Sequence, residues 1–267
     1  MITARLNGGL GNKMFQIATA YSLALYNEDE CAFNMQDHVV HQGNSAYTYQ
    51  GNVFKKLKEL PANWQPQYCY QEPRPNYNPI PYYTNMIIQG DFASERYFLT
   101  FKNEVIDLFK DRELIAEIKR KYDGLWDNSV SLHIRRGDYV KSASVLLTME
   151  YYNTAIGLLE QKETISHIVV VSDDIAWCKN NFRDRRATFI EGEPDYVDFY
   201  MQTLCNHNII SNSSFSWWGT YLNENVNKIV YAPAIWYDYD GYRDFKDFFC
   251  DNWILIKTNY IRNYAKR

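Results

Sequence analysis

The second half of the chain alternates short apolar runs with helical patterns, and this alternation narrows the choice of fold more than any other feature. The apolar runs predict strands at 130–134, 168–171, 188–190, 209–210 and 229–231. The segments between them predict helices at 149–161, 175–181, 195–206 and 215–223. Because strands that alternate with helices pair in parallel through right-handed crossovers, we expect an α/β fold with a parallel sheet.

The first half begins with another strand, loop and helix. Residues 2–6 predict a strand, residues 7–12 read N-G-G-L-G-N, and residues 13–26 predict a helix. This layout places backbone N–H groups and a helix N-terminus near an anion or a polar substrate. Gly9 and Gly11 fit two positions of the dinucleotide pattern G-x-G-x-x-G, whose third position is Met14 here. The loop is therefore either a ligand site or a tight turn that requires glycine.

The rest of the first half is less regular. We expect a strand over 31–35, a short helix over 53–60, a strand over 85–89 and a helix over 103–122. Residues 61–83 combine prolines with Tyr and Trp, which excludes long regular elements and leaves either an ordered aromatic insertion or a mobile flap. Asp123 and Gly124 end the last helix, so the predicted domains are 1–125 and 126–267.

The strand at 130–134 ends in a cluster of charge. The segment V-S-L-H-I-R-R-G-D-Y at 130–139 alternates apolar and polar residues and then presents Arg135, Arg136, Gly137 and Asp138. Open α/β sheets bind ligands at the carboxyl ends of their strands, and an arginine there can hold a phosphate or a carboxylate bidentately. Asp138 either supports an arginine or handles a proton. The alternative is an ordinary surface ion pair after a strand.

Two further predicted strands end in polar groups. Residues 171–174 read V-S-D-D, where one acid N-caps the next helix and the other accepts hydrogen bonds from a base edge or a sugar. Residues 210–219 read I-S-N-S-S-F-S-W-W-G. Hydroxyls, an amide and backbone N–H groups at a helix N-terminus suit a phosphate. A serine turn and a cap would explain two of the serines without any ligand.

Composition argues against several classes of protein. The net charge of −4 gives no global attraction to nucleic acid. The five cysteines are odd in number and form no C-x-x-C pair, which argues against a disulfide framework or a zinc site. No apolar run approaches the ~18 residues of a membrane span, and no signal peptide is recognisable, so we expect a cytoplasmic protein. The 23 Tyr, 14 Phe and 7 Trp suit stacking on sugars or bases as well as core packing.

Five motifs resemble those of the bacterial α-1,2-fucosyltransferases and their relatives. They span almost the whole chain and follow the order expected for that family. G-G-L-G-N-K-M-F-Q at 8–16 looks like the N-terminal motif of that family, and H-I-R-R-G-D-Y at 133–139 looks like its signature. V-S-D-D-I-A-W-C at 171–178 and I-S-N-S-S-F-S-W-W-G at 210–219 resemble the next two. G-D-F-A-S-E-R-Y-F at 90–98 is similar to a further block but departs from it at several positions, which puts the choice of acceptor in doubt.

The resemblance implies a GT-B type fold of two facing Rossmann-like domains with parallel sheets, an N-terminal acceptor-side domain and a C-terminal domain that binds GDP-fucose. It implies transfer of L-fucose, with inversion, to the 2-hydroxyl of a β-galactoside, without a metal ion or another cofactor. The residues predicted to be catalytic are Arg135, Asp138, Asn12 and Glu95. The residues that it predicts to bind GDP-fucose are His133, Arg135, Arg136, Asp173, Asn212, Ser213, Ser214, Phe215, Gly9 and Gly11.

The predicted mechanism is electrostatic, because charge grows on the β-phosphate as GDP leaves. Arg135, with donors from 212–215 and Asn12, would stabilise that charge. His133 and Asp173 are similar to residues that hold guanine and ribose in related fucosyltransferases, although His133 is alternatively a strand histidine on the polar face of the sheet.

Several points stay open at this stage. Asp138, Glu95 and Asp91 are candidates for the general base by residue type. The D-x-D triplet at 238–240 lies in a tyrosine-rich segment and is not expected to bind metal. A lectin-like carbohydrate-binding protein without a phosphate site is the main alternative, and a flavin or nicotinamide oxidoreductase built on Gly9 and Gly11 is a weaker one. As a fucosyltransferase, the protein would act in surface glycan or O-antigen synthesis, on a free or lipid-linked oligosaccharide.

Overall fold

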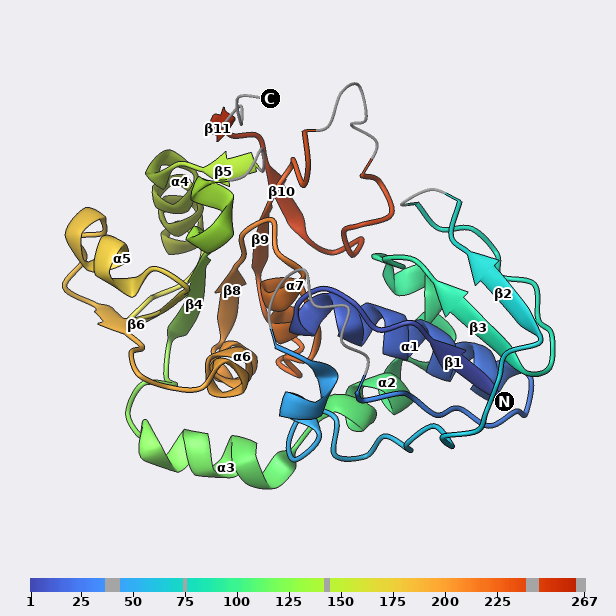
Figure 1. The fold of residues 1–267 in the computed structure, drawn as a ribbon. Helices are drawn as coiled ribbons and strands as arrows, with labels where there is room; N and C mark the ends of the chain where they lie inside the picture. The colour runs from blue at the N-terminus through green and yellow to red at the C-terminus, as the bar shows by residue number, and fades with distance from the viewer. Residues whose placement is uncertain (37–43, 74–75, 142–144, 239–244, 263–267) are drawn as a thin grey trace. The chain divides into compact units, whose positions relative to one another are not determined.

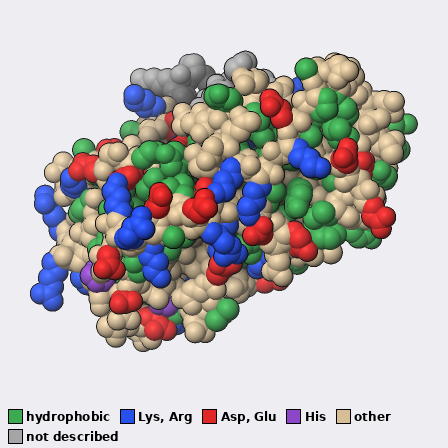
Figure 2. All heavy atoms as spheres, turned by 90° about the horizontal axis from the view of Figure 1, so that it is seen from below, with side chains coloured by type: hydrophobic (Ala, Val, Ile, Leu, Met, Phe, Trp, Pro, Cys, Tyr) green, Lys and Arg blue, Asp and Glu red, His purple; other side chains and the backbone are tan. Residues whose placement is uncertain are grey.

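The structure is a computed structural model that describes residues 1–36, 44–73, 76–141, 145–238 and 245–262. It divides into two compact units, Met1–Asp111 with Asp244–Cys250 and Arg112–Arg243 with Asp251–Arg267. Figure 1 shows the ribbon and the labels of its helices and strands. On the face drawn in Figure 2, basic and acidic side chains are interspersed, in keeping with the small net charge of −4.

The first unit is built on a small parallel sheet. Its strands β1 (Ile2–Ala4), β2 (Tyr68–Gln71) and β3 (Met86–Gln89) lie in the order β1-β3-β2, and both pairs are parallel. Helix α1 (Leu10–Tyr26) packs on β1, and α2 (Lys102–Phe109) packs on α1. Short 3-10 turns lie at Ala46–Tyr49, Glu95–Tyr97 and Leu99–Phe101. Most of α1 is buried, because its alanines let neighbouring segments approach closely.

The second unit is built on a six-stranded parallel sheet. Its strands are β4 (Ser129–Ile134), β6 (His167–Ser172), β7 (Ala187–Phe189), β8 (His207–Ile209), β9 (Val230–Pro233) and β10 (Ile254–Ile256). They lie in the order β10-β9-β8-β4-β6-β7, with every pair parallel. The helices are α3 (Arg112–Lys121), α4 (Met149–Glu160), α5 (Ile175–Asn181), α6 (Asp195–Leu204) and α7 (Ser214–Tyr221). A 3-10 turn, Gly137–Val140, follows β4, and β5 (Val145–Leu147) pairs antiparallel with β11 (Tyr260–Arg262).

The central strand β4 is buried on both faces but has a different chemistry on each. Val130, Leu132 and Ile134 belong to the apolar core that residues of α4 and α5 share. The alternate residues Ser131 and His133 are buried too. Ser131 Oγ accepts a hydrogen bond of 2.7 Å from Asn208 Nδ2, which also donates to a carbonyl of α6. The apolar face therefore packs with residues of α4 and α5, and the polar face is joined through Asn208 to β8 and α6.

The regular second half follows the sequence prediction, and the first half departs from it in places. The helix predicted over 103–122 is two helices, because Lys110 is extended (ψ 118°) and ends α2. Residues 53–60 contain turns and no helix. Residues 31–35 form isolated bridges, Cys31 with Ile2 and Phe33 with Glu59, and no strand. Strands β2, β5, β10 and β11 were not predicted, and β2 lies within the proline-rich segment.

Helix α3 packs against α6 in the second unit, whereas the sequence-based division at residue 125 assigned it to the N-terminal domain. The functional roles of the two predicted domains stay predictions. Among the residues that the structure describes, no helix is long and apolar enough to span a membrane.

Candidate functional site

The order in which the chain adds strands to the large sheet reverses next to β4. From β4 it adds β6 and β7 on one side, and it then returns to add β8, β9 and β10 on the other side. In open parallel sheets, ligands bind beyond the carboxyl ends of the strands at such a reversal. The three polar segments singled out in the sequence follow β4, β6 and β8, which are adjacent strands. The fold therefore gathers them beyond the carboxyl ends of three adjacent strands, of which β4 is the middle one (Figure 1).

Arg135, directly after β4, is held by two carboxylates. Its Nη1 lies 2.7 Å from Asp173 Oδ2, and its Nη2 donates to Asp138 Oδ1. The guanidinium also lies 5.2 Å from the centre of the Tyr139 ring. A guanidinium has about five N–H donors, so these bonds leave others for a ligand. Nε is buried and has no hydrogen-bond partner among the described residues, which marks an unsatisfied donor at this position.

Asp173 links Arg135 to the backbone of the same loop. Its Oδ1 accepts a 2.8 Å hydrogen bond from the backbone N–H of Arg136. A Cβ added at Gly137 would lie 2.4 Å from Asp173 Oδ2, so this close approach requires glycine. Both carboxylate oxygens thus hold the arginine loop in place. Contact between Asp173 and a nucleotide, which the resemblance implies, stays a prediction.

Arg136 is fixed by a second set of contacts. Its Nε donates to Asp174 Oδ2 over 3.1 Å, and its guanidinium carbon lies 3.6 Å from the centre of the Trp177 ring. Asp174 also N-caps α5, because its Oδ1 accepts from the backbone N–H of Trp177. Asp174 is therefore the capping acid of the pair. Trp177 was not predicted as a site residue, although it stands three residues after that cap.

His133 is buried at the end of β4. Its Nδ1 lies 2.8 Å from Ser211 Oγ, and its ring centre lies 5.4 Å from that of Phe215. Burial, and then the nearby charge of Arg135, lower the pKa of His133 to about 3. The imidazole is therefore neutral at ordinary pH. Only 4% of His133 is exposed, and its predicted contact with the nucleotide stays a prediction.

The segment between β8 and α7 is held by its own hydrogen bonds. Asn212 Nδ2 donates to the carbonyls of Val145 and Trp236, each over 3.0 Å. Tyr139 Oη donates to the carbonyl of Asn212 over 3.1 Å, which joins this segment to the arginine loop. The side-chain amide of Asn212 thus positions the loop, and its predicted role as a ligand donor stays untested.

Three more predicted ligand residues surround the start of α7. Ser213 is its N-cap residue, and the backbone N–H of Ser213 donates to the carbonyl of Ser211. Ser214 and Phe215 are half-buried in the first turn. The structure therefore brings together, in the second unit, the predicted residues of 133–138, 173 and 212–215.

The glycine loop of the first unit is organised by a buried lysine. Lys13 is 1% exposed, and its Nζ donates to the carbonyls of Gly8 and Asn44. Gly8 has a φ of 73°, the left-handed region that favours glycine, and a Cβ there would lie 2.5 Å from Asn12 Nδ2. The glycine requirement is thus clearest at Gly8. Gly9 has open space, and Gly11 lies buried in the first turn of α1.

A second buried polar side chain, Gln16, fixes the same loop. It exchanges hydrogen bonds with Asn7, through Nε2 to Asn7 Oδ1 (3.1 Å) and Oε1 from the Asn7 backbone N–H (2.9 Å). Its Nε2 also donates to the carbonyl of Gly90, directly after β3. The loop between β1 and α1 is therefore tied to the end of the neighbouring strand. Lys13 and Gln16 belong to the motif at 8–16 but were not predicted to have a role.

Glu95, one of the three candidates for the general base, is half-buried in the 3-10 turn after β3. Its side chain makes no hydrogen bond among the described residues. Nearby in this unit, Glu72 accepts hydrogen bonds from the backbone N–H groups of Asp91 and Phe92 and from Tyr97 Oη. Burial raises the pKa of Glu72. No sequence pattern indicated Glu72, because its partners are 19 to 25 residues away.

The comparisons with known proteins are consistent with this arrangement. The sequence profile described as glycosyl transferase family 11 matches residues 1–257. The chain belongs to glycosyl transferase family 11. An α-1,2-colitosyltransferase of Escherichia coli is 29% identical over 96% of this chain and 99% of that protein. Galactoside α-(1,2)-fucosyltransferase 2 of Oryctolagus cuniculus is 26% identical over 83% of this chain and 67% of that protein. The resemblance stated from the motifs is confirmed.

A solved structure supports the fold of this family 11 member. A mutant of Arabidopsis thaliana FUT1, in complex with GDP, matches 86% of this chain and 70% of that chain with a TM-score of 0.53 and 10% identity. The predicted fold class, α/β with parallel sheets of the GT-B type, is confirmed. The chain is a glycosyltransferase with α-1,2-fucosyltransferases and an α-1,2-colitosyltransferase among its relatives.

Proposed function

We propose that this family 11 glycosyltransferase moves L-fucose from GDP-fucose to the 2-hydroxyl of a β-galactoside, with inversion at the transferred carbon and without a metal ion. The main support is Arg135, which directly follows β4, where the strand order of the large sheet reverses. Two carboxylates fix its guanidinium, its side chain is 28% exposed, and the two ion pairs leave other N–H groups unused. A preorganised cation with unused donors suits a diphosphate.

In the proposed reaction, the bond between the fucosyl carbon and the β-phosphate oxygen breaks, and the oxygen keeps the electron pair. The N–H groups of Arg135 stabilise the negative charge that develops there. The N–H groups at the start of α7 and the side chain of Asn12 are proposed as further donors to the diphosphate. Loss of one such charged contact should lower the rate by a factor on the order of 10²–10³.

Asp138 and Glu95 take different parts in this proposal. Asp138 is paired with Arg135, so we assign it to orienting the guanidinium. Glu95 has no side-chain hydrogen bond among the described residues and is the candidate that accepts the proton of the attacking hydroxyl. Glu95→Gln keeps the shape of the side chain and removes its basicity. It should lower kcat while leaving the binding of GDP unchanged.

The remaining features of the proposal follow from the resemblance. The positive charge that a metal would supply is assigned to Arg135. Asp240 of the D-x-D triplet lies outside the described residues, and Asp238 accepts a hydrogen bond from Tyr260 Oη. We propose a galactose-containing glycan, free or lipid-linked, as the acceptor, a cytoplasmic location and no nucleic-acid partner.

Colitose is the second candidate for the transferred sugar. It is favoured by the Escherichia coli relative named α-1,2-colitosyltransferase, which matches 96% of this chain. Colitose lacks the 3-hydroxyl of fucose. A donor site that hydrogen-bonds this hydroxyl would reject colitose strongly, because its polar partners would be left unpaired. The two donors are therefore separable by experiment.

The test measures GDP release with excess EDTA, from GDP-fucose or GDP-colitose, with and without lactose. The proposal predicts lactose-stimulated release from GDP-fucose that EDTA does not inhibit and that Arg135→Ala abolishes. Faster release of GDP from GDP-colitose than from GDP-fucose would show that colitose, and not fucose, is the transferred sugar. Loss of activity in EDTA that Mg²⁺ restores would overturn the metal-free mechanism. A protein that binds galactosides but neither GDP-sugar would favour the carbohydrate-binding alternative.

A further inference from the structure

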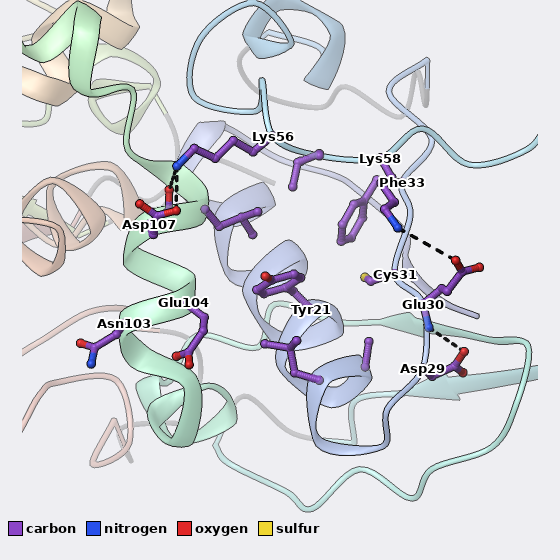
Figure 3. Close-up of a pocket in the computed structure, with 14 residues that line it drawn as sticks. Tyr21, Asp29, Glu30, Cys31, Phe33, Lys56, Lys58, Asn103, Glu104 and Asp107 are labelled. Atoms are coloured by element: carbon purple, nitrogen blue, oxygen red, sulfur yellow. Dashed lines mark hydrogen bonds and ion pairs between the residues drawn. The ribbon is translucent and has the colours of Figure 1, made fainter.

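The first unit contains a groove of about 700 Å³ that is separate from the glycine loop. The groove lies between the C-terminal half of α1, the helix α2 and the segments 29–33 and 56–58 (Figure 3). Tyr21 is the nearest lining residue of α1 to the loop, nine positions after Asn12. At ~1.5 Å per residue, the groove begins roughly 14 Å along α1 from that loop. No step of the proposed reaction uses it.

The floor of the groove is apolar and partly aromatic. Tyr21 lies in the middle of it, with its hydroxyl turned toward α2 (Figure 3). Leu25, Leu57 and Leu108 also line it. Burial raises the pKa of Tyr21, and the nearby Cys31 and then the carboxylates of α2 add to this effect, so the phenol keeps its proton. The Tyr21 hydroxyl makes no hydrogen bond among the described residues. The floor thus combines an aromatic ring with an unused donor.

The rim of the groove is polar, and most of its charges are paired. Lys56 Nζ lies 2.8 Å from Asp107 Oδ2, and Lys58 Nζ lies 4.0 Å from Glu30 Oε1. Asp29 pairs with the N-terminal amine at 2.8 Å. Glu104, on α2, lines the groove and makes no hydrogen bond or ion pair among the described residues. The rim therefore offers donors and acceptors together, and Glu104 is its one charged side chain without an ion pair among the described residues.

This chemistry selects one class of ligand. An anion would meet more carboxylates than ammonium groups, and both lysines are already paired. A compact cation would gain only Glu104 and would lie beside the two lysines. A neutral saccharide has an apolar C–H face for the Tyr21 ring and hydroxyls that both donate and accept. We infer that this groove is a second, non-catalytic binding site for a neutral oligosaccharide, which is distinct from the proposed donor site.

The experiment measures binding without turnover. In protein with ¹³C-labelled leucine methyl groups, lacto-N-neotetraose is titrated and the signals of Leu25, Leu57 and Leu108 are followed. The inference predicts saturable shifts of these methyls. It predicts at least about fivefold weaker binding for Tyr21→Ala and Glu104→Ala, since losing a stacked ring or a hydrogen-bond acceptor changes affinity by such factors. Glu104→Gln, which can still accept a hydrogen bond, should retain most of the affinity.

A matched control comes from the same helix. Tyr26 is 73% exposed and does not line the groove, so Tyr26→Ala should leave the affinity unchanged. Anionic 3′-sialyllactose should bind more weakly than lactose. Unmoved leucine methyls, equal losses for Tyr21→Ala and Tyr26→Ala, or preference for the anionic sugar would overturn the inference. GDP is titrated separately against the same sample. Methyl shifts with the glycan but no GDP binding would reject the proposed donor and leave this site standing.

Discussion

Gly137→Ala should disrupt the arginine loop through one identified contact. The new methyl carbon would lie 2.4 Å from Asp173 Oδ2 and 3.0 Å from its Cγ. The backbone of Gly137 is outside the left-handed region, so alanine is otherwise tolerated. To reach ordinary contact, the carboxylate must retreat by roughly 1 Å. That movement breaks its 2.7 Å ion pair with Arg135 and its 2.8 Å bond to the Arg136 N–H.

The expected cost follows from these two bonds. Hydrogen bonds to charged groups contribute about 1.5–3 kcal/mol. Asp173 and Arg135 are 27% and 28% exposed, so solvent screens their ion pair and we expect about 1–2 kcal/mol of lost stability. Urea denaturation of the ligand-free protein measures it. The rate of GDP release should fall as well, because Arg135 loses a support.

A double-mutant cycle tests whether this cost passes through Asp173. In Asp173→Ala, the clashing atoms are gone, and the remaining Cβ is an ordinary 3.7 Å from the added methyl. Gly137→Ala should then cost less than about 0.5 kcal/mol in that background. Additive effects of the two substitutions, or a Gly137→Ala variant as stable and active as the wild type, would refute this reasoning.

Three further predictions concern single groups. Burial, and then neighbouring carboxylates, raise the pKa of Asp198 to about 7. Between pH 4 and 7 the folded state therefore holds a proton that the unfolded state loses. The free energy of unfolding should fall over this range by up to about 1.4 kcal/mol per pH unit. Asp198→Asn should flatten this slope in urea titrations. The pKa of His133 is about 3, so ¹⁵N NMR at pH 5 should show a neutral imidazole, and titration near pH 6.5 would contradict its burial. Gly157→Ala, in α4 with open space around it, should raise stability by about 0.5–1 kcal/mol, and a loss would show an unseen clash.

The sequence predicted the local elements of the second unit because their signals are local. Strands β4 and β6 are short apolar runs, and α5 begins at an aspartate cap, so each can be recognised without knowing its neighbours. The contact between Asp173 and Gly137 is different. It arises because β4 and β6 pair with Ile134 opposite Ser172, which brings two loops together that are far apart in the chain. That register is a property of the folded sheet.

Other features of the first unit were hidden for identifiable reasons. Strand β2 is a mostly exposed edge strand without alternating burial, and it lies among prolines that argue against strands. The break between α2 and α3 has no glycine or proline to mark it. Lys13 reads as a solvated charge, yet it is buried because backbone carbonyls of Gly8 and Asn44 accept its hydrogen bonds. Each case depends on tertiary contacts that a pattern does not contain.

The central claim is that Arg135 binds the diphosphate of the donor, and its most direct test compares the affinities of GDP and GMP. Calorimetry on the wild type and Arg135→Ala, with the fold of both checked by circular dichroism, separates the β-phosphate from the rest of the nucleotide. We predict that Arg135→Ala weakens GDP binding by a factor on the order of 10² and GMP binding far less. Equal losses for the two nucleotides, or an unchanged affinity for GDP, would contradict the claim.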